Sequence, residues 1–254
     1  MQASLECLEC FLRQALRAAR RATDDETVHR RILDAVAERI PAMDLSDSPA
    51  ALSHASYELT RDLSGNADPY AEVKRAQNEA ALEIAPELRQ LVRDSADPLA
   101  TALHLAAAGN VIDLGVLEHD EIDVWAAVDQ ARRERFAVDH LEALRAALED
   151  CNDLLFLLDN AGEIVFDRIL IEELQKHTAV TAVVKGGPII NDATREDAEQ
   201  VGLPEICEVI DNGGAFIGSP LSQVPGWFIE RMHRADLIVG KGQANYETVD
   251  DFPG

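Results

Sequence analysis

Lysine is scarce in this chain of 254 residues, and the four that occur are Lys74, Lys176, Lys185 and Lys241. Lys and Arg together number 23 against 47 Asp and Glu, which gives a formal net charge of −24. A field of this sign repels nucleic acids and anionic membranes, because binding either one requires Lys and Arg to neutralise phosphates. We therefore expect neither a nucleic-acid partner nor a membrane partner.

Long apolar runs and cysteines are also sparse. No stretch approaches the roughly 20 apolar residues of a membrane span, and the N-terminus lacks the basic-then-apolar layout of a signal peptide. Cys7 and Cys10 form a C-x-x-C, while Cys151 and Cys207 are isolated. These cysteines are too few for a disulfide framework, so we expect reduced thiols and a cytoplasmic protein. Buried thiols are favoured over a zinc site for the four cysteines.

The first hundred or so residues have the apolar spacing of helices. The pattern runs from Leu5 to Leu16 and again from Val28 to Ile40, before Pro41. Further helices are expected near 47–62, 70–93 and 98–107, and a last one at about 134–150. We assign residues 1–105 to a helical lobe.

The second half changes period. Short apolar runs without polar alternation occur at Leu154–Leu158, Ala179–Val184, Ile206–Ile210 and Leu237–Val239. Runs of this kind are typical of strands buried on both faces, hence of a parallel sheet. Helical stretches lie between them near 163–176, 194–201 and 221–233. We predict an α/β fold for residues 106–254, a doubly wound, mostly parallel Rossmann-like α/β/α sheet that forms one integrated unit with the lobe.

Each predicted strand ends in a polar cluster. The clusters are Asp159–Glu163, then Lys185–Pro188 followed by Asn191 and Asp192, then Asp211–Gly214, and last Gly240–Gln243. Because the carboxyl ends of parallel strands lie along one edge, where ligands bind, the four clusters indicate a single site.

The residue types at this edge suit a metal and a phosphate. Asp159, Asn160 and Asp192 offer the hard oxygen ligands that Mg²⁺ and Mn²⁺ prefer. Gly162 and Glu163 begin a helix whose free N–H groups favour an anion. Lys185 and Lys241 add positive charge beside glycines. No P-loop, complete dinucleotide-binding motif, nucleophile elbow or zinc-protease motif is present.

Several blocks resemble the signature of the damage-control phosphatases, the ARMT-like family formerly called domain of unknown function 89. They are Leu158–Glu163 with Phe166-Asp167, Lys185–Pro188 with Asn191-Asp192-x-Thr194, and Lys241–Gln243 with Asn245–Glu247. Asp68–Tyr70 with Lys74, and Ala108–Asn110 with Ile112-Asp113, resemble its N-terminal blocks, and Cys7-x-x-Cys10 resembles its mainly prokaryotic subfamily. The chain ends soon after Glu247, where the family continues with a further helix and strand.

The resemblance implies a metal-dependent phosphatase of small phosphorylated metabolites, such as damaged or surplus ones. Asp159, Asn160 and Asp192 would hold a divalent metal, for which Mn²⁺, Mg²⁺, Co²⁺ and Ni²⁺ are all plausible. Asp159, Asp192 and Lys241 would be catalytic. The substrate and its phosphate would be bound by Asn110, Asp113, Glu163, Lys185, Gly242, Gln243 and Asn245. Substrate identity and oligomeric state are not predicted.

The residues alone leave two alternative functions open. The first is an S-adenosylmethionine-dependent carboxyl methyltransferase on the same Rossmann-like core. A strand end rich in carboxylates is, however, not what an adenosyl pocket needs. The second is a non-catalytic metal- or nucleotide-binding protein, which would bind its ligand without turnover.

The excess of acidic residues also predicts a response to salt. An acidic surface poor in lysine is favoured in a high-salt cytoplasm, because counter-ions screen the self-repulsion of the folded chain. We expect the melting temperature to rise from low to molar KCl. A melting temperature that is flat over this range would contradict a halophilic adaptation.

Overall fold

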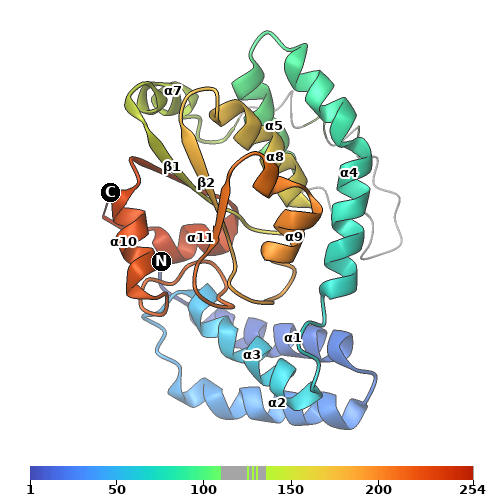
Figure 1. Cartoon of the computed structure of the whole chain (residues 1–254). Coiled ribbons are helices and arrows are strands. Elements are labelled where there is room, and N and C mark those ends of the chain that lie inside the picture. Colours follow the sequence, from blue (N-terminus) through green and yellow to red (C-terminus); the bar gives the residue numbers. More distant parts are fainter. Residues whose placement is uncertain (110–124, 126–127, 129, 131–135, 254) are drawn as a thin grey trace.

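The computed structural model describes residues 1–109, 125, 128, 130 and 136–253, and Figure 1 shows their arrangement. Three helices begin the chain, α1 (Leu5–Ala22), α2 (Glu26–Arg39) and α3 (Pro49–Ser64). They pack on one another around Ala15, Ala19, Ile32 and Val36. Ser48 caps α3, which carries a proline in its first turn, and Gly65 ends it at a φ of 71°. This left-handed conformation is the one that glycine adopts at helix ends without strain.

The next two helices run from this bundle to the sheet. They are α4 (Ala71–Arg93) and α5 (Pro98–Gly109), and Figure 1 shows the long α4 connecting the two parts of the molecule. Both helices contribute buried residues to the same core cluster as the sheet. The assignment of residues 1–105 to one lobe stays a prediction, but α4 and α5 pack on α8 (Glu163–Leu174), a helix of the α/β part.

The sheet contains β1 (Asp153–Leu157), β2 (Ala179–Val184), β3 (Glu208–Asp211) and β4 (Leu237–Gly240). Its order within the described residues is β3-β2-β1-β4, and every pairing is parallel. Leu154, Phe156 and Leu158 pack in the cluster with α5 and α8 (Glu163–Leu174), whereas Leu155 and Leu157 pack against α10 (Gly226–Arg234). Successive side chains of a strand point to opposite faces, so β1 is covered on both sides. The predicted doubly wound α/β fold is confirmed.

Several boundaries differ from those predicted. The helix expected from about 134 is α7, Leu141–Asp150, and the one expected from about 221 begins at Gly226 behind Pro225. The helix expected at 194–201 is the short α9, Arg195–Gln200. An unpredicted helix, α11 (Gly242–Val249), follows β4 directly and covers the sequence block that begins at Lys241.

The strand order places a crossover between β1 and β4. After β1 the chain moves outward to β2 and β3, and it then returns to the other side of β1 as β4. Open α/β sheets bind ligands at such a switch point, outside the carboxyl ends of the strands. In this chain that point lies between Asp159 and Lys241. In the described part of the chain, no helix is long and apolar enough to cross a membrane. The cytoplasmic location stays a prediction.

The packing of α5 on α8 generates a prediction about stability. Phe166 is fully buried on α8, and a side chain on Gly109 of α5 would approach its ring carbons to about 3.0 Å. We expect Phe166→Ala to lower the free energy of unfolding by about 3–5 kcal/mol, because a large cavity remains in a tightly packed contact. Leu5→Ala, at a side chain that is 72% exposed, should change it by less than about 0.5 kcal/mol. Urea titrations of both variants measure the difference, and equal losses would show that this contact is not part of the core.

Candidate active site

The loops after β1 and β2 meet beside the switch point of the sheet. Asn160 and Asp192 pair as an isolated antiparallel bridge, and the Ala193 N–H donates to the Asp159 carbonyl at 2.7 Å. The Ala161 N–H donates to the Asn191 carbonyl at 2.8 Å. The side chain of Asn160 donates to Asp159 Oδ2 at 2.8 Å and to Glu163 Oε2 at 3.3 Å. The structure thus brings the three predicted metal ligands together.

Both aspartates of this set are almost enclosed by protein. Asp159 is 7% exposed and Asp192 is 4% exposed. Burial raises the pKa of Asp159 to about 6 and that of Asp192 to about 7, despite the opposing charge of Lys185 in both cases. Removing carboxylates from water favours their neutral form unless a cation compensates. An added positive charge would therefore stabilise the ionised form of both carboxyl groups.

Lys185 supplies part of that charge from the end of β2. Its Nζ lies 3.6 Å from Asp192 Oδ2, and it donates to the Leu158 carbonyl and to Asn245 Oδ1 at 3.4 and 3.5 Å. Asn245 is itself buried and donates to the carbonyls of Leu158 and Lys241. The predicted phosphate-binding residues Lys185 and Asn245 therefore lie beside the acidic pair, and Asn245 ties β1 to the first turn of α11.

Lys241 lies on the other side of Asp159, where it contacts acidic side chains of α8. Its Nζ donates to Glu163 Oε1 at 2.5 Å, to Asp167 Oδ1 at 2.6 Å and to the Ala106 carbonyl at 2.9 Å. Burial lowers the pKa of Lys241, but the charges of Asp167 and Glu163 more than offset this and leave the pKa above its ordinary value. The sequence predicts an ammonium that meets phosphoryl oxygens, whereas here its three donors serve acceptors within the protein. Its catalytic role stays a prediction.

Gly242 places the first turn of α11 directly against Asp159. Its φ is +79°, and a Cβ on it would lie 1.8 Å from Asp159 Oδ2. The Asp159 carboxylate thus occupies the space that a side chain at position 242 would fill. An anion at this place also gains from the partial positive charge of the helix N-terminus.

The other predicted substrate-binding residues do not all lie beside the acidic pair. Gln243 donates to Glu247 Oε1 at 2.6 Å, and Glu247 Oε2 accepts from the Ala50 N–H at the start of α3. Gln243 thus supports a link between α11 and the helical bundle. Asn110 and Asp113 lie outside the described residues. None of the four cysteines forms a disulfide. Cys151 is buried, and Cys7, Cys10 and Cys207 are half-buried.

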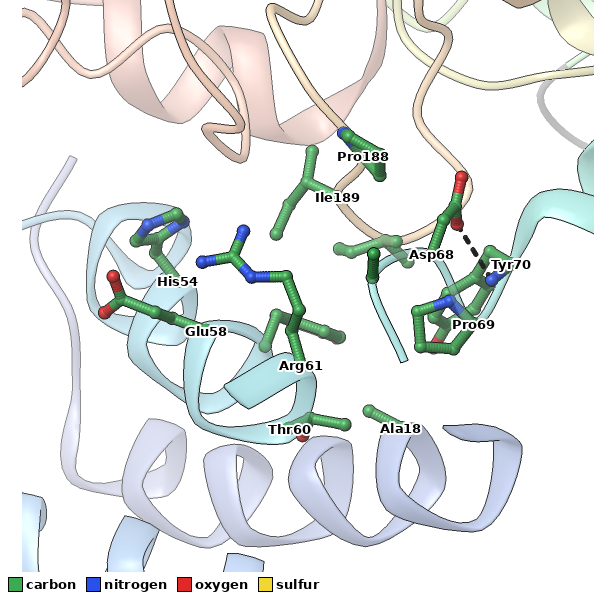
Figure 2. Close-up of a pocket in the computed structure, with 13 residues that line it drawn as sticks. Ala18, His54, Glu58, Thr60, Arg61, Asp68, Pro69, Tyr70, Pro188 and Ile189 are labelled. Atoms are coloured by element: carbon green, nitrogen blue, oxygen red, sulfur yellow. Dashed lines mark hydrogen bonds between the residues drawn. The ribbon is translucent and has the colours of Figure 1, made fainter. Parts of the chain in front are cut away.

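Asp68 and Pro188 line two hollows in the described part of the chain, and residues of the loop between Lys185 and Thr194 line both. One has a volume of about 300 Å³ and opens beside Lys185, Thr194 and Arg195. The other is a small cavity of about 30 Å³ between α1, α3 and the loop at Pro188. Figure 2 shows Arg61 of α3 extending into it toward His54 and Ile189. Ile190, which also lines it, has a φ of 45°, an uncommon conformation for a β-branched residue two positions before Asp192.

Sequence reasoning missed Asn78 and Asp197. Asn78 accepts from the Gly162 N–H at 2.7 Å and donates to Asp197 Oδ1 at 3.0 Å. Asp197 Oδ2 also accepts a hydrogen bond from Lys74 Nζ at 3.0 Å. Two signals pointed to them, because Lys74 and Asn78 have the four-residue spacing of one helix face and Thr194-x-x-Asp197 has the spacing of a capping box.

The predicted ligand set suits a divalent cation with oxygen ligands. No group of three or more His, Cys, Asp and Glu side chains in the described ranges is arranged to hold a metal. The set at the switch point contains two carboxylates and one amide, a composition that Mg²⁺ and Mn²⁺ accept with waters completing the shell. Asp192 Oδ2 is buried and has no hydrogen-bond partner among the described residues. An unsatisfied buried carboxylate oxygen of this kind fits a metal ligand.

An open parallel sheet with an acidic site at its switch point defines an α/β protein of Rossmann-like class. The family model described as damage-control phosphatase ARMT1-like domain matches residues 3–252. The chain therefore belongs to the damage-control phosphatase family with the ARMT1-like domain, which confirms the resemblance in the sequence.

Individual relatives agree with this assignment. A damage-control phosphatase from Archaeoglobus fulgidus is 34% identical, over 99% of this chain and 88% of the relative. One from Pyrococcus horikoshii is 32% identical, over 99% and 88%. An uncharacterized protein from Methanocaldococcus jannaschii is 35% identical, over 97% and 83%. The crystal structure of a DUF89 family protein from Pyrococcus horikoshii superimposes with a TM-score of 0.91 at 31% identity, covering 100% of this chain and 89% of that one.

The contact between Gly242 and Asp159 generates a prediction. We expect Gly242→Ala to weaken Mn²⁺ binding by about 10–100-fold, because the added Cβ displaces the carboxylate. Gly226→Ala is the matched control, since a Cβ at the start of α10 meets nothing within 4 Å. Titrating both variants with Mn²⁺ measures the effect. Parental affinity in Gly242→Ala would show that Asp159 does not bind the metal from this position.

Proposed function

We propose that the chain is a metal-dependent phosphatase that hydrolyses phosphomonoesters of small metabolites, in the damage-control role for which its relatives are named. Family membership over residues 3–252 supports phosphatase activity. The observation that carries the metal dependence is the meeting of Asp159 and Asp192, both buried and with raised pKa values, at the carboxyl ends of β1 and β2.

Asp159, Asn160 and Asp192 would hold the divalent cation, which is Mn²⁺, Mg²⁺, Co²⁺ or Ni²⁺. When bound there, a cation of this kind polarises a phosphoryl oxygen and lowers the pKa of an attacking water. The buried position of both aspartates keeps bulk water away, which strengthens electrostatic interactions between the protein and a bound ester.

The remaining residues would orient the ester. Lys185 lies 3.6 Å from Asp192 Oδ2 and also lines the hollow of about 300 Å³, so its ammonium would contact phosphoryl oxygens that enter from that side. Asn245 and the Leu158 carbonyl hold the ammonium in place. The hollow beside Gly186, Gly187 and Arg195 would receive the organic part of the substrate.

Lys241 would act at one remove from the ester. It lies between Glu163 and Asp167, and Glu163 accepts from Asn160. Its charge thus offsets two buried carboxylates. It also holds Glu163 in place as the hydrogen-bond acceptor of Asn160. In this arrangement Lys241 compensates the charge of Glu163 and Asp167, which is a different role from direct contact with the phosphoryl group.

Asp159→Asn tests the proposed function at the centre of the site. The substitution keeps the shape of the side chain and removes its charge. We therefore expect a folded protein that loses metal binding and loses on the order of 10²-fold or more in kcat/KM. Asp150→Asn, at an exposed position before β1, is the matched control and should behave as the parent does.

The assay is phosphate release from a panel of phosphorylated metabolites with Mg²⁺, Mn²⁺, Co²⁺ and Ni²⁺ supplied in turn. A chelator should abolish turnover, and an added divalent ion should restore it. Phosphate release at the parental rate by Asp159→Asn would contradict the metal site. Methyl transfer from S-adenosylmethionine by the parent, without phosphate release, would contradict the phosphatase.

A further inference from the structure

Asn78 of α4 connects the two loops that carry the predicted metal ligands. Its side chain is completely buried. Its Oδ1 accepts from the Gly162 N–H at 2.7 Å, and its Nδ2 donates to Asp197 Oδ1 at 3.0 Å and to Gln200 Oε1 at 2.8 Å. Gly162 lies two residues after Asn160, at the start of α8. Asp197 lies in the first turn of α9, which follows the loop of Asp192.

Asp197 extends this connection to the loop of Asp192. Its Oδ2 accepts from the Thr194 N–H at 2.8 Å, from Thr194 Oγ1 at 2.7 Å and from Lys74 Nζ at 3.0 Å. Thr194 lies two residues after Asp192 and pairs with Lys185 as an isolated parallel bridge. Lys74 also lies 3.5 Å from Asp68 Oδ2. One face of α4 thus contacts the chain just beyond each of the two predicted aspartate ligands.

The chemistry at position 78 requires an amide. The side chain must accept from a backbone N–H and donate to a carboxylate, and among side chains of this size the asparagine amide does both. Aspartate would place a second carboxylate against Asp197, and leucine would leave the Gly162 N–H and Asp197 Oδ1 without these partners. Leaving a buried polar group unsatisfied, or placing two carboxylates together, is unfavourable, so either change would favour movement of the two loops apart.

We propose that Asn78 is a positioning residue that fixes the spacing of Asp159 and Asp192 and thereby sets the affinity of the site for a divalent cation. The inference rests on the metal assignment of the proposed function. Asn78 does not contact the predicted ligands. It acts through Gly162 on the loop of Asp159 and Asn160, and through Asp197 and Thr194 on the loop of Asp192.

The test measures Mn²⁺ binding by the electron paramagnetic resonance signal of the free ion, with thermal unfolding of the same samples. Asn78→Asp and Asn78→Leu should raise the dissociation constant for Mn²⁺ by about 10–100-fold, the range for partners that orient metal ligands. The exchange variant Asn78→Asp with Asp197→Asn returns one carboxylate and one amide to the pair. Gln200 can turn its amide so that its N–H donates to the new carboxylate at position 78, and it then gives up its exposed hydrogen bond to the Arg75 carbonyl. Because water can replace that exposed bond, we expect Mn²⁺ affinity within about threefold of the parent.

Arg89→Met is the matched control for a general loosening of α4. Arg89 makes bidentate contacts of 3.0–3.1 Å with Glu172 of α8, well along the helix from the loops. This variant should lower the melting temperature and leave Mn²⁺ affinity as in the parent. Mn²⁺ affinity that falls equally in Arg89→Met would overturn the inference, because loosening α4 would then be sufficient.

Parental Mn²⁺ affinity in folded Asn78→Asp or Asn78→Leu would also overturn it. If both single variants fail to fold, the exchange variant decides, and its failure to bind Mn²⁺ as the parent does counts against the inference. A parent that binds no Mn²⁺ overturns the inference together with the metal assignment. Phosphate release by the parent is measured separately, so a chain that binds Mn²⁺ without turnover contradicts the proposed function and leaves the role of Asn78 standing.

Discussion

Two groups of buried acidic side chains lie around the carboxyl ends of β1 and β2 in the described part of the chain, and a lysine lies against each group. Asp159 and Asp192 flank Lys185, while Glu163 and Asp167 flank Lys241. Burial raises the pKa of Asp167 to about 7 despite the charge of Lys241, and its Oδ2 has no hydrogen-bond partner among the described residues. Charges removed from water at this density are costly unless they are paired. The architecture around the site follows from that constraint.

Helices of the N-terminal half help to satisfy the buried polar groups around the site. Asn78 and Lys74 of α4 hold Asp197 and Gly162, and Glu247 of α11 holds the first turn of α3. Each contact satisfies a buried group and joins α3 or α4 to a segment that follows a strand and lies far away in the sequence. Buried hydrogen bonds of this kind hold the loops in one arrangement, which is what a site with preorganised charges requires. The bundle and the sheet therefore depend on each other for the shape of the site.

Much of the fold could be predicted from the sequence, because strands that are buried on both faces have continuous apolar runs. The strands at Leu154 and Ala179, and the edge where Asp159 and Asp192 meet, follow from those runs and from the rule for parallel strands. The helix α11 could not be predicted, since its glycine and polar residues resemble a loop. The partners of Lys241 were also hidden, because α8 carries Glu163 and Asp167 on a segment whose other residues are mostly apolar. Long-range hydrogen bonds such as that of Asn78 have no periodicity to reveal them.

We infer above all that the buried acidic pair at the switch point binds a divalent cation. Crystals grown with Mn²⁺ and measured at an X-ray wavelength where manganese scatters anomalously test it most directly. We expect one strong anomalous peak within coordination distance of side-chain oxygens from Asp159, Asn160 and Asp192. A peak elsewhere in the protein, with these three side chains free of metal at saturating Mn²⁺, would contradict it.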